Sequence, residues 1–382
     1  MDFALTDEQL MFLDMFRDFA RQEVAPLAEE LDRQERPPLE TIHKAAALDL
    51  LAIPFPEQYD GMNAGLLAYG LLMEELGKVC LATAVTVGAH CTAAMLIAAG
   101  GTEEQKQSLL PSLVKGHKIG AYAIVEPDAG SDLSGVATTA RLDGNEYVLN
   151  GRKSHVVNGD FADLLVVLAQ TERGPACFVV DKSSPGLVVG WRNKQMGLRG
   201  AAGCTIFLDG CRLAMSNRLG GEEQNGHDII RRTWPFSRLG VAFACLGIAE
   251  RGLADSVEFA RNRQQFGGPI ALKQIIQRYL ADMATQIESL RHMAHYTAWL
   301  MEQGRSSERD IAMLKLWAGE VATWVINKTV QIHGGMGYIK SFHVERLYRD
   351  VRAMAIHEGT AELQRLAVAE DILAAVGVVT AP

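Results

Sequence analysis

The sequence predicts a mainly α protein with a β middle domain. Three observations support this: residues 1–117 carry apolar residues at helical spacing, residues 118–220 contain short runs of β-forming residues, and residues 221–382 return to long helical patterns. We therefore expect an N-terminal helical domain, a β-barrel-like domain and a C-terminal helical bundle domain. At 382 residues the chain is long enough for two or three domains with buried cores.

Composition excludes several classes of function. The net charge of −9 gives no basic footprint for nucleic acid or an anionic membrane surface, so neither partner is expected. We expect no apolar stretch of the roughly 18 residues that a membrane span needs, and the start MDFALTDEQL is unlike a secretory or transit peptide. We expect a cytoplasmic protein.

Cysteine and histidine spacing indicates neither disulfides nor a metal. The six cysteines are far apart and form no CxxC pair, so they are expected to be reduced and mostly buried. His292 and His295 are three residues apart on a predicted helix, but without a third protein ligand they favour a structural role.

The N-terminal domain opens with a helix start signal. Thr6 and Gln9 form a capping box before apolar residues at helical spacing, and Pro26 should kink or end that helix. Further helical windows cover residues 39–50, 64–78 and 81–98. Thr102 and Gln105 repeat the capping box for a helix that reaches about Lys115.

The middle domain shows strand-like runs without long helical patterns between them. The runs are IGAYAIV, YVLNG, DLLVVLA, ACFVV, GLVV and CTIFL, each bounded by Gly, Asp, Asn or Pro. Asp143-Gly144 is a turn signal. This texture favours an antiparallel sheet or barrel over a Rossmann domain.

The C-terminal domain contains two apolar seams typical of packed long helices. In the first seam the steps alternate between four and three: Ile276, Leu280, Met283, Ile287, Leu290, Ala294, Thr297 and Met301. The second seam is Ile311, Leu314, Ala318, Val321 and Val325. GGMG at residues 334–337 follows a predicted helix rather than a strand, so it lacks the context of a dinucleotide-binding turn.

Several segments look shaped for a ligand, and together they resemble one family. Clustered glycines or an open helix N-terminus mark YAIVEPDAGSD at 122–132, RNRQQFGGPI at 261–270, the GGMG segment and Gly359-Thr360. With NGRKSHVVN, MGLR, RQQFGGPI, QIHGGMGY and IHEGTAELQR, in this order, they resemble the motifs of the acyl-CoA dehydrogenase family of flavoproteins. The resemblance runs from the first helix to Glu370.

The resemblance implies a three-domain fold, a cofactor and an assembly. It implies a helical domain, a β-barrel-like domain and a C-terminal four-helix bundle that bind FAD at their junction, commonly in a homotetramer. The positions that match family FAD contacts are Tyr122, Ile124, Val125, Gly130, Ser131, His155, Val157, Arg263, Phe266, Gln274, Gln331, Gly334, Gly335, Thr360 and Glu362. The six from Arg263 to Gly335 would reach the adenosine diphosphate part across a subunit interface.

The resemblance also assigns the chemistry. Glu358 matches the catalytic base, which removes the α proton of an acyl thioester while the β hydride passes to flavin N5; burial should raise its pKa. Ser131, Arg238 and Gly359 match substrate-contacting positions. Some members carry the base just before the residue that matches Arg238, but Ser237 stands there and cannot serve as a carboxylate base.

Departures from the family pattern lie beside the flavin ring, next to Glu358 and at the position that contacts coenzyme A. Val125, Val157 and His155 replace two usual threonines and a tryptophan beside the ring, which puts the electron acceptor in doubt. His357 replaces a tyrosine; as a cation it would lower the pKa of Glu358, and as a neutral ring it would only pack. Glu370 stands where many relatives place an arginine that contacts coenzyme A.

The expected function is the oxidation of a saturated acyl-CoA to the 2-enoyl thioester, with an electron-transferring flavoprotein as acceptor. Glu370, and Pro235 near a position that is often acidic, leave open the same oxidation on an acyl carrier protein. An oxidase that uses oxygen and a non-catalytic flavin-binding subunit are further alternatives. Residues 84–97 hold no Arg or Lys, which speaks against a dicarboxylic substrate.

Overall fold

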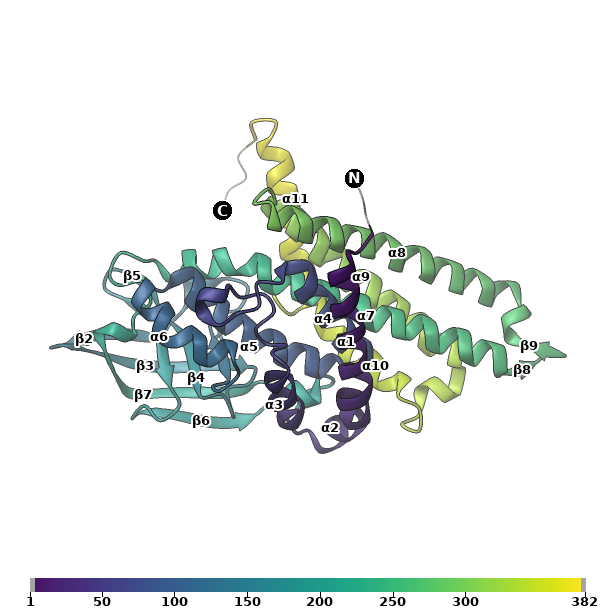
Figure 1. Ribbon diagram of the computed structural model, residues 1–382, viewed down its shortest axis with the longest axis horizontal. Helices are drawn as coiled ribbons and strands as arrows, with labels where there is room; N and C mark the ends of the chain where they lie inside the picture. The colour runs from purple at the N-terminus through teal and green to yellow at the C-terminus, as the bar shows by residue number, and fades with distance from the viewer. Residues whose placement is uncertain (1–3, 379–382) are drawn as a thin grey trace.

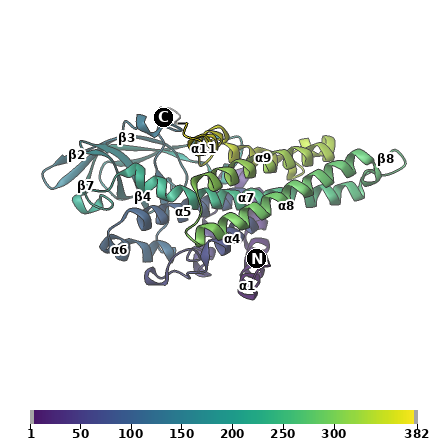
Figure 2. The ribbon, with the colours of Figure 1, turned by 90° about the horizontal axis from the view of Figure 1, so that it is seen from above.

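The computed structural model describes residues 4–378, which form a helical N-terminal part, a curled sheet and a helical C-terminal part. Figure 1 shows the sheet at one end of the long axis and the tips of the longest helices at the other. Figure 2 shows the same separation from above. This arrangement confirms the mainly α fold with a β middle domain.

Two of the N-terminal α-helices, the first and the last in the series below, start where the capping signals indicate. The α-helices of this part are α1 (Asp7–Phe19), α2 (Ala28–Gln34), α3 (Leu39–Ala47), α4 (Gly65–Val79), α5 (Leu81–Gly100) and α6 (Glu103–Val114). Thr6 and Thr102 form the expected capping boxes with Gln9 and Gln105. After α1 the chain passes through a π turn, residues 20–24, and a 3₁₀ turn that contains Pro26, so the break predicted from that proline is confirmed.

Helix α5 corrects one expectation. Leu81–Gly100 has a mean hydropathy of 1.7 over 18 residues, so a stretch long and apolar enough for a membrane span does exist. In this structure 83% of that window is buried inside the protein. It packs against α6, α7 and β1, which makes it a core helix of the fold and explains why it is apolar on every face.

The middle part is one seven-stranded sheet in the order β1-β4-β2-β3-β7-β6, with β5 paired to β4. The strands are β1 (Gly120–Ala123), β2 (Thr139–Asp143), β3 (Glu146–Val156), β4 (Leu164–Thr171), β5 (Gly174–Asp181), β6 (Leu187–Arg192) and β7 (Cys204–Ala214). Most pairs are antiparallel, as expected, but β1 and β2 each pair with β4 in parallel. The Asp143-Gly144 signal is confirmed as the β2–β3 hairpin, with Gly144 at φ +64.

The C-terminal part is built on α7 (Gly226–Asn262), α8 (Gln274–Glu302) and α9 (Glu308–His333), with α10 (Val344–Val351) and α11 (Ala361–Ala374) beyond. Its two predicted seams are confirmed. The central members of the α8 seam, from Met283 to Thr297, and all five of the α9 seam are buried. The short strands β8 (Gln264–Gln265) and β9 (Gly268–Pro269) form the hairpin at the far tip of the helices (Figure 1).

Candidate active site

A cavity of about 330 Å³ lies where the three parts of the chain meet. Most of the site residues expected from the sequence line it together, although they come from β1, the loop after β1, β3, α7 and the segment before α11. Those residues are Tyr122, Ile124, Val125, Gly130, Ser131, His155, Val157, Arg238, Glu358, Gly359 and Thr360. Tyr122 and Glu358, which are 236 residues apart in the sequence, are therefore brought to one space.

Glu358 enters this cavity from a strained turn. Its φ is +56, a left-handed conformation that is uncommon for a residue with a Cβ, and Gly359 follows at φ +91. A Cβ at position 359 would lie 2.5 Å from Gln364 Nε2, so only glycine fits there. Strain of this kind persists only where the surroundings hold it in place.

Two cationic side chains hold the carbonyl groups of that turn. Arg238 on α7 donates from Nε to the Glu358 main-chain oxygen at 3.3 Å, and Lys315 on α9 donates to the Gly359 oxygen. Lys315 is only 1% exposed, and burial lowers its pKa to about 8. Sequence reasoning missed Lys315, although it lies four residues after Ile311 on the buried face of α9, where a lysine is unusual.

The carboxylate of Glu358 accepts hydrogen bonds on both oxygens. The Tyr122 hydroxyl donates to Oε1, and the Ser237 hydroxyl donates to Oε2 at 2.7 Å. Only 8% of the Glu358 side chain is exposed. Burial and the nearby carboxylate hold the pKa of Tyr122 well above its usual range, so the phenol stays a proton donor. Ser237 thus contacts the Glu358 carboxylate, an interaction that sequence reasoning did not foresee.

Burial pushes the pKa of Glu358 upward, but its neighbours outweigh burial. His357, the two hydroxyl donors and the Arg238 guanidinium favour the charged form, so the pKa lies below the usual range of a glutamate. The expectation of a raised pKa was therefore wrong. Burial lowers the pKa of His357, whose Nε2 lies 3.8 Å from Glu358 Oε1. The imidazole is thus mostly neutral at pH 7. The groups that stabilise the charged Glu358 carboxylate at that pH are therefore the two hydroxyl donors and Arg238.

Removal of either hydroxyl donor should raise the pKa of Glu358. For Ser237→Ala and Tyr122→Phe we expect the acidic limb of the kcat/KM profile to move to higher pH, because the base works only when it is ionised. Thr233→Val is the matched control. Thr233 lines the same cavity from the same helix, but its hydroxyl donates to the Ile229 carbonyl at 3.0 Å. An acidic limb that stays in place in both variants would contradict this prediction.

A buried ion pair supports the segment after β1, which lines the cavity. Lys153 on β3 contacts Glu126 Oε1 at 2.6 Å and donates to the Ile124 carbonyl at 3.1 Å, while the Glu126 carboxylate also accepts from the Ala137 and Thr138 amides. Lys153 is fully buried. The pair therefore fixes the cavity-lining segment from Tyr122 to Ser131 against the sheet.

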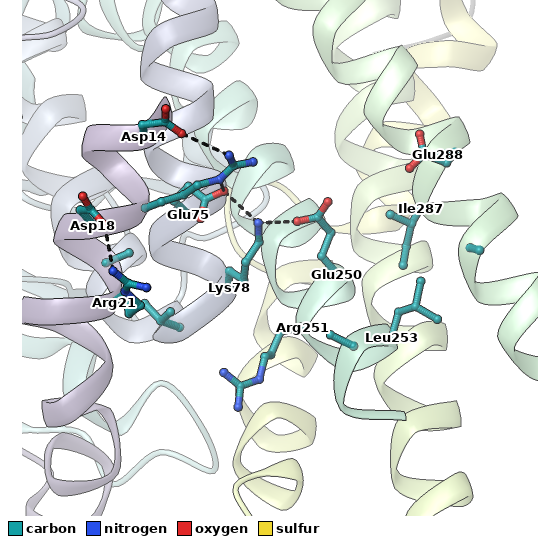
Figure 3. A pocket seen from close by; sticks show the side chains of 15 residues that line it. Asp14, Asp18, Arg21, Glu75, Lys78, Glu250, Arg251, Leu253, Ile287 and Glu288 are labelled. Carbon is teal, nitrogen blue, oxygen red and sulfur yellow. Dashed lines mark hydrogen bonds and ion pairs between the residues drawn. The ribbon is translucent and has the colours of Figure 1, made fainter. Parts of the chain in front are cut away.

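A larger cavity of about 930 Å³ lies elsewhere, between α1, α4, α7 and α8. Figure 3 shows that charged side chains line it, with Lys78 bridging Glu75 at 2.8 Å and Glu250 at 2.6 Å. It contains none of the expected site residues. Its ion pairs connect the N-terminal helices to the C-terminal helices, which indicates a structural role, so the smaller cavity is the candidate active site.

Comparison with known proteins identifies the family of the chain. The chain matches the acyl-CoA dehydrogenase N-terminal domain over residues 6–117, the middle domain over 121–211 and the C-terminal domain over 224–373. The chain belongs to the acyl-CoA dehydrogenase family. Family membership implies a flavin cofactor and an acyl-CoA substrate, and makes the protein an oxidoreductase.

Individual relatives cover the whole chain. Acryloyl-CoA reductase (NADH) of Anaerotignum propionicum is 40% identical over 98% of this chain and 96% of its own. The short-chain specific acyl-CoA dehydrogenase of Clostridium acetobutylicum is 38% identical over 97% of this chain and all of its own. The structure of butyryl-CoA dehydrogenase from Megasphaera elsdenii superposes with a TM-score of 0.94 at 36% identity, over 98% and 100% of the two chains.

A further structural match concerns electron transfer. A chain in the structure of the electron transferring flavoprotein of Acidaminococcus fermentans superposes with a TM-score of 0.95 at 37% identity. The match covers 98% of this chain and 100% of that chain.

Seven of the positions with family flavin contacts do not line the cavity of their own chain. Glu362 is exposed on the first turn of α11. The other six are also exposed and lie at the far ends of α7, α8 and α9, near the β8–β9 hairpin (Figure 1): Arg263, Phe266, Gln274, Gln331, Gly334 and Gly335. One chain therefore does not bring these six to Glu358.

Proposed function

We propose that this acyl-CoA dehydrogenase family member uses FAD to form an α,β double bond in a short saturated acyl-CoA thioester, with Glu358 as the base. The observation that carries the proposal is the Glu358 carboxylate, which is buried at the interdomain cavity and held by two hydroxyl donors. A fixed, water-poor carboxylate suits removal of a weakly acidic α proton.

The lining of the cavity fits a flavin. Ile124, Val125 and Val157 give an apolar wall, while Ser131 and the N-terminus of α11 at Thr360 offer polar groups, the mixture that cofactor sites use. FAD bound there supplies the acceptor for the β hydride. The six exposed residues at the helix tips would contact FAD held by a second copy, which supports a homo-oligomer; the homotetramer is the family expectation.

Residues of this chain remove the α proton, orient the base and bind the thioester carbonyl. Glu358 takes the α proton on its carboxylate, and Tyr122 and Ser237 keep the carboxylate ionised and oriented beforehand. Within residues 4–378 the Glu358 backbone N–H has no hydrogen-bond acceptor, so it is available to the thioester carbonyl. Arg238 and Lys315 hold the carbonyl groups of the turn and thereby aim that N–H.

A short acyl group fits the space beyond Glu358. A second cavity of about 20 Å³ adjoins the base and is lined by Tyr69, Met73, Tyr122, Ser237 and Glu358 among others. That volume is close to the size of a single water molecule. Acyl groups of three to five carbons, roughly, are therefore expected to react fastest, because longer chains would need the packed core around α4 and α5 to open.

The same residues serve either direction of the reaction. One relative is named as an acryloyl-CoA reductase and another as a short-chain acyl-CoA dehydrogenase. We infer dehydrogenation with an electron-transferring flavoprotein as acceptor in the cytoplasm, and the match to a chain from work on the electron transferring flavoprotein of Acidaminococcus fermentans supports that partner. Peroxide formed on turnover would instead identify an oxidase.

The carrier of the acyl thioester has two candidates, coenzyme A and an acyl carrier protein. Glu370 is exposed on α11, as a group that contacts a phosphate-bearing ligand would be, but its charge is negative. Repulsion from coenzyme A phosphates would favour an acyl carrier protein as the carrier instead. Activity with a loaded carrier protein and none with any CoA ester would establish that alternative.

Anaerobic titration of the flavin-loaded protein with acyl-CoA esters tests the proposal. We expect propionyl- and butyryl-CoA to bleach the oxidised flavin, octanoyl-CoA to do so at least about tenfold more weakly and glutaryl-CoA not at all, because burying an unpaired carboxylate is costly. Bleaching by octanoyl-CoA alone would contradict the short-chain assignment. Absence of bleaching by every ester would overturn the acyl-CoA substrate.

A further inference from the structure

Tyr69 lines the small cavity that also contacts Glu358. The residue lies on α4, is 0% exposed and lines that cavity together with Gly88 on α5 and Gly240 on α7. Its ring stacks on Phe236 with ring centroids 4.5 Å apart. Packing from three helices therefore fixes the direction of the phenol.

The hydroxyl of Tyr69 points at glycines rather than at polar groups. A Cβ at Gly240 would lie 2.7 Å from Tyr69 Oη, and a Cβ at Gly88 would lie 3.9 Å from it. Both glycines line the cavity, so the oxygen is at the cavity wall. The glycine at 240 makes room for this hydroxyl, because any side chain there would collide with it.

Within residues 4–378 the Tyr69 hydroxyl has no hydrogen-bond partner. The Glu358 oxygens already accept bonds from Tyr122 and Ser237, and the remaining wall is largely apolar: Met73, Val85, Ala89, Val241, Ala244 and Met354. Burial holds the pKa of Tyr69 well above its usual range, so the group remains a proton donor. A buried hydroxyl without a partner destabilises a folded protein, which phenylalanine would avoid.

We propose that Tyr69 is a specificity-determining residue whose hydroxyl donates a hydrogen bond to an oxygen at the distal end of a short acyl group. This inference rests on the proposed function and narrows its substrate class from plain short acyl chains to short acyl chains that carry a carbonyl or ether oxygen. A neutral oxygen fits, since Glu358 is the nearby anion and a second carboxylate would be repelled.

A pair of thioesters of matched shape tests the inference. 4-Oxopentanoyl-CoA and 4-methylpentanoyl-CoA differ at the fourth carbon of the acyl chain. The first compound has a carbonyl oxygen there, and the second has a hydrogen and an additional methyl group. The measurement is the ratio of their kcat/KM values in the wild type and in Tyr69→Phe. Intrinsic reactivity cancels between the two proteins, and we expect the ratio to fall about tenfold in the variant, the effect of one neutral hydrogen bond.

Tyr59→Phe is the matched control. Tyr59 is also a buried residue, but its hydroxyl donates to Glu103 at 3.0 Å in the N-terminal part, away from the cavity. The ratio should remain at its wild-type value in this variant. A ratio that falls equally in both variants, or in neither, would overturn the inference.

Binding to the Glu358→Gln protein, in which turnover is slow, gives a second readout that does not require Tyr69→Phe to fold. Followed by the flavin absorbance, 4-oxopentanoyl-CoA should bind about tenfold more tightly than 4-methylpentanoyl-CoA. Equal binding of the two thioesters would contradict the role of Tyr69. If the wild type still turns over butyryl-CoA, the proposed function is unaffected. Failure of the wild type with butyryl-CoA and every other thioester would overturn both.

Discussion

Glu358→Gln should lower kcat/KM for butyryl-CoA by roughly 10²–10⁴-fold, the range that a positioned general base contributes. The amide keeps the shape of the side chain and can accept one hydrogen bond from Tyr122 or Ser237, but it cannot take up the α proton. Flavin content and the midpoint of thermal unfolding should stay close to wild type. Stopped-flow bleaching of the flavin under anaerobic conditions measures the loss directly.

The position of Ser237 provides a sharper version of this test. Its hydroxyl oxygen lies 2.7 Å from Glu358 Oε2, so a carboxylate introduced there would reach the same region of the cavity from α7. In Glu358→Ala, addition of Ser237→Glu should recover part of the lost activity. Full activity in Glu358→Gln alone would mean that another group removes the proton and would overturn the assignment of the base.

Local patterns were sufficient for much of the fold. Capping boxes at Thr6 and Thr102 and the seams on α8 and α9 follow from residues within a few positions of each other, so sequence spacing reveals them. Strand β2 was missed because most of it is exposed and TARLD contains only two apolar residues, Ala140 and Leu142. The parallel pairing of β1 with β4 depends on contacts between segments more than 40 residues apart, which spacing cannot show.

The candidate site was also predicted only in part from the sequence. Glu358 and the cavity-lining residues were found through motifs, yet their interactions were not. The left-handed φ of Glu358, its hydrogen bonds to Tyr122 and Ser237, and the support from Lys315 join four elements that are distant in the sequence. The direction of the Glu358 pKa shift depends on those contacts, so burial alone led to the wrong sign.

Lys153→Met should lower the free energy of unfolding by about 3–5 kcal/mol, the cost of leaving one partner of a buried ion pair unpaired. Lys153 is fully buried and Glu126 is only 6% exposed, so water cannot replace the lost ammonium. Chemical denaturation measures the loss. Flavin should also dissociate more readily, because the lysine holds the Ile124 carbonyl in the segment that lines the cavity.

Two comparisons separate the buried charge from the loss of a side chain. Lys118→Met removes the same side chain from an exposed pair with Asp181 at 3.5 Å, and should cost no more than about 1 kcal/mol. Adding Glu126→Gln to Lys153→Met should recover part of the stability, because a neutral amide can still accept from the Ala137 and Thr138 amides. If the double variant were less stable than Lys153→Met alone, the uncompensated carboxylate would not be the cause of the loss.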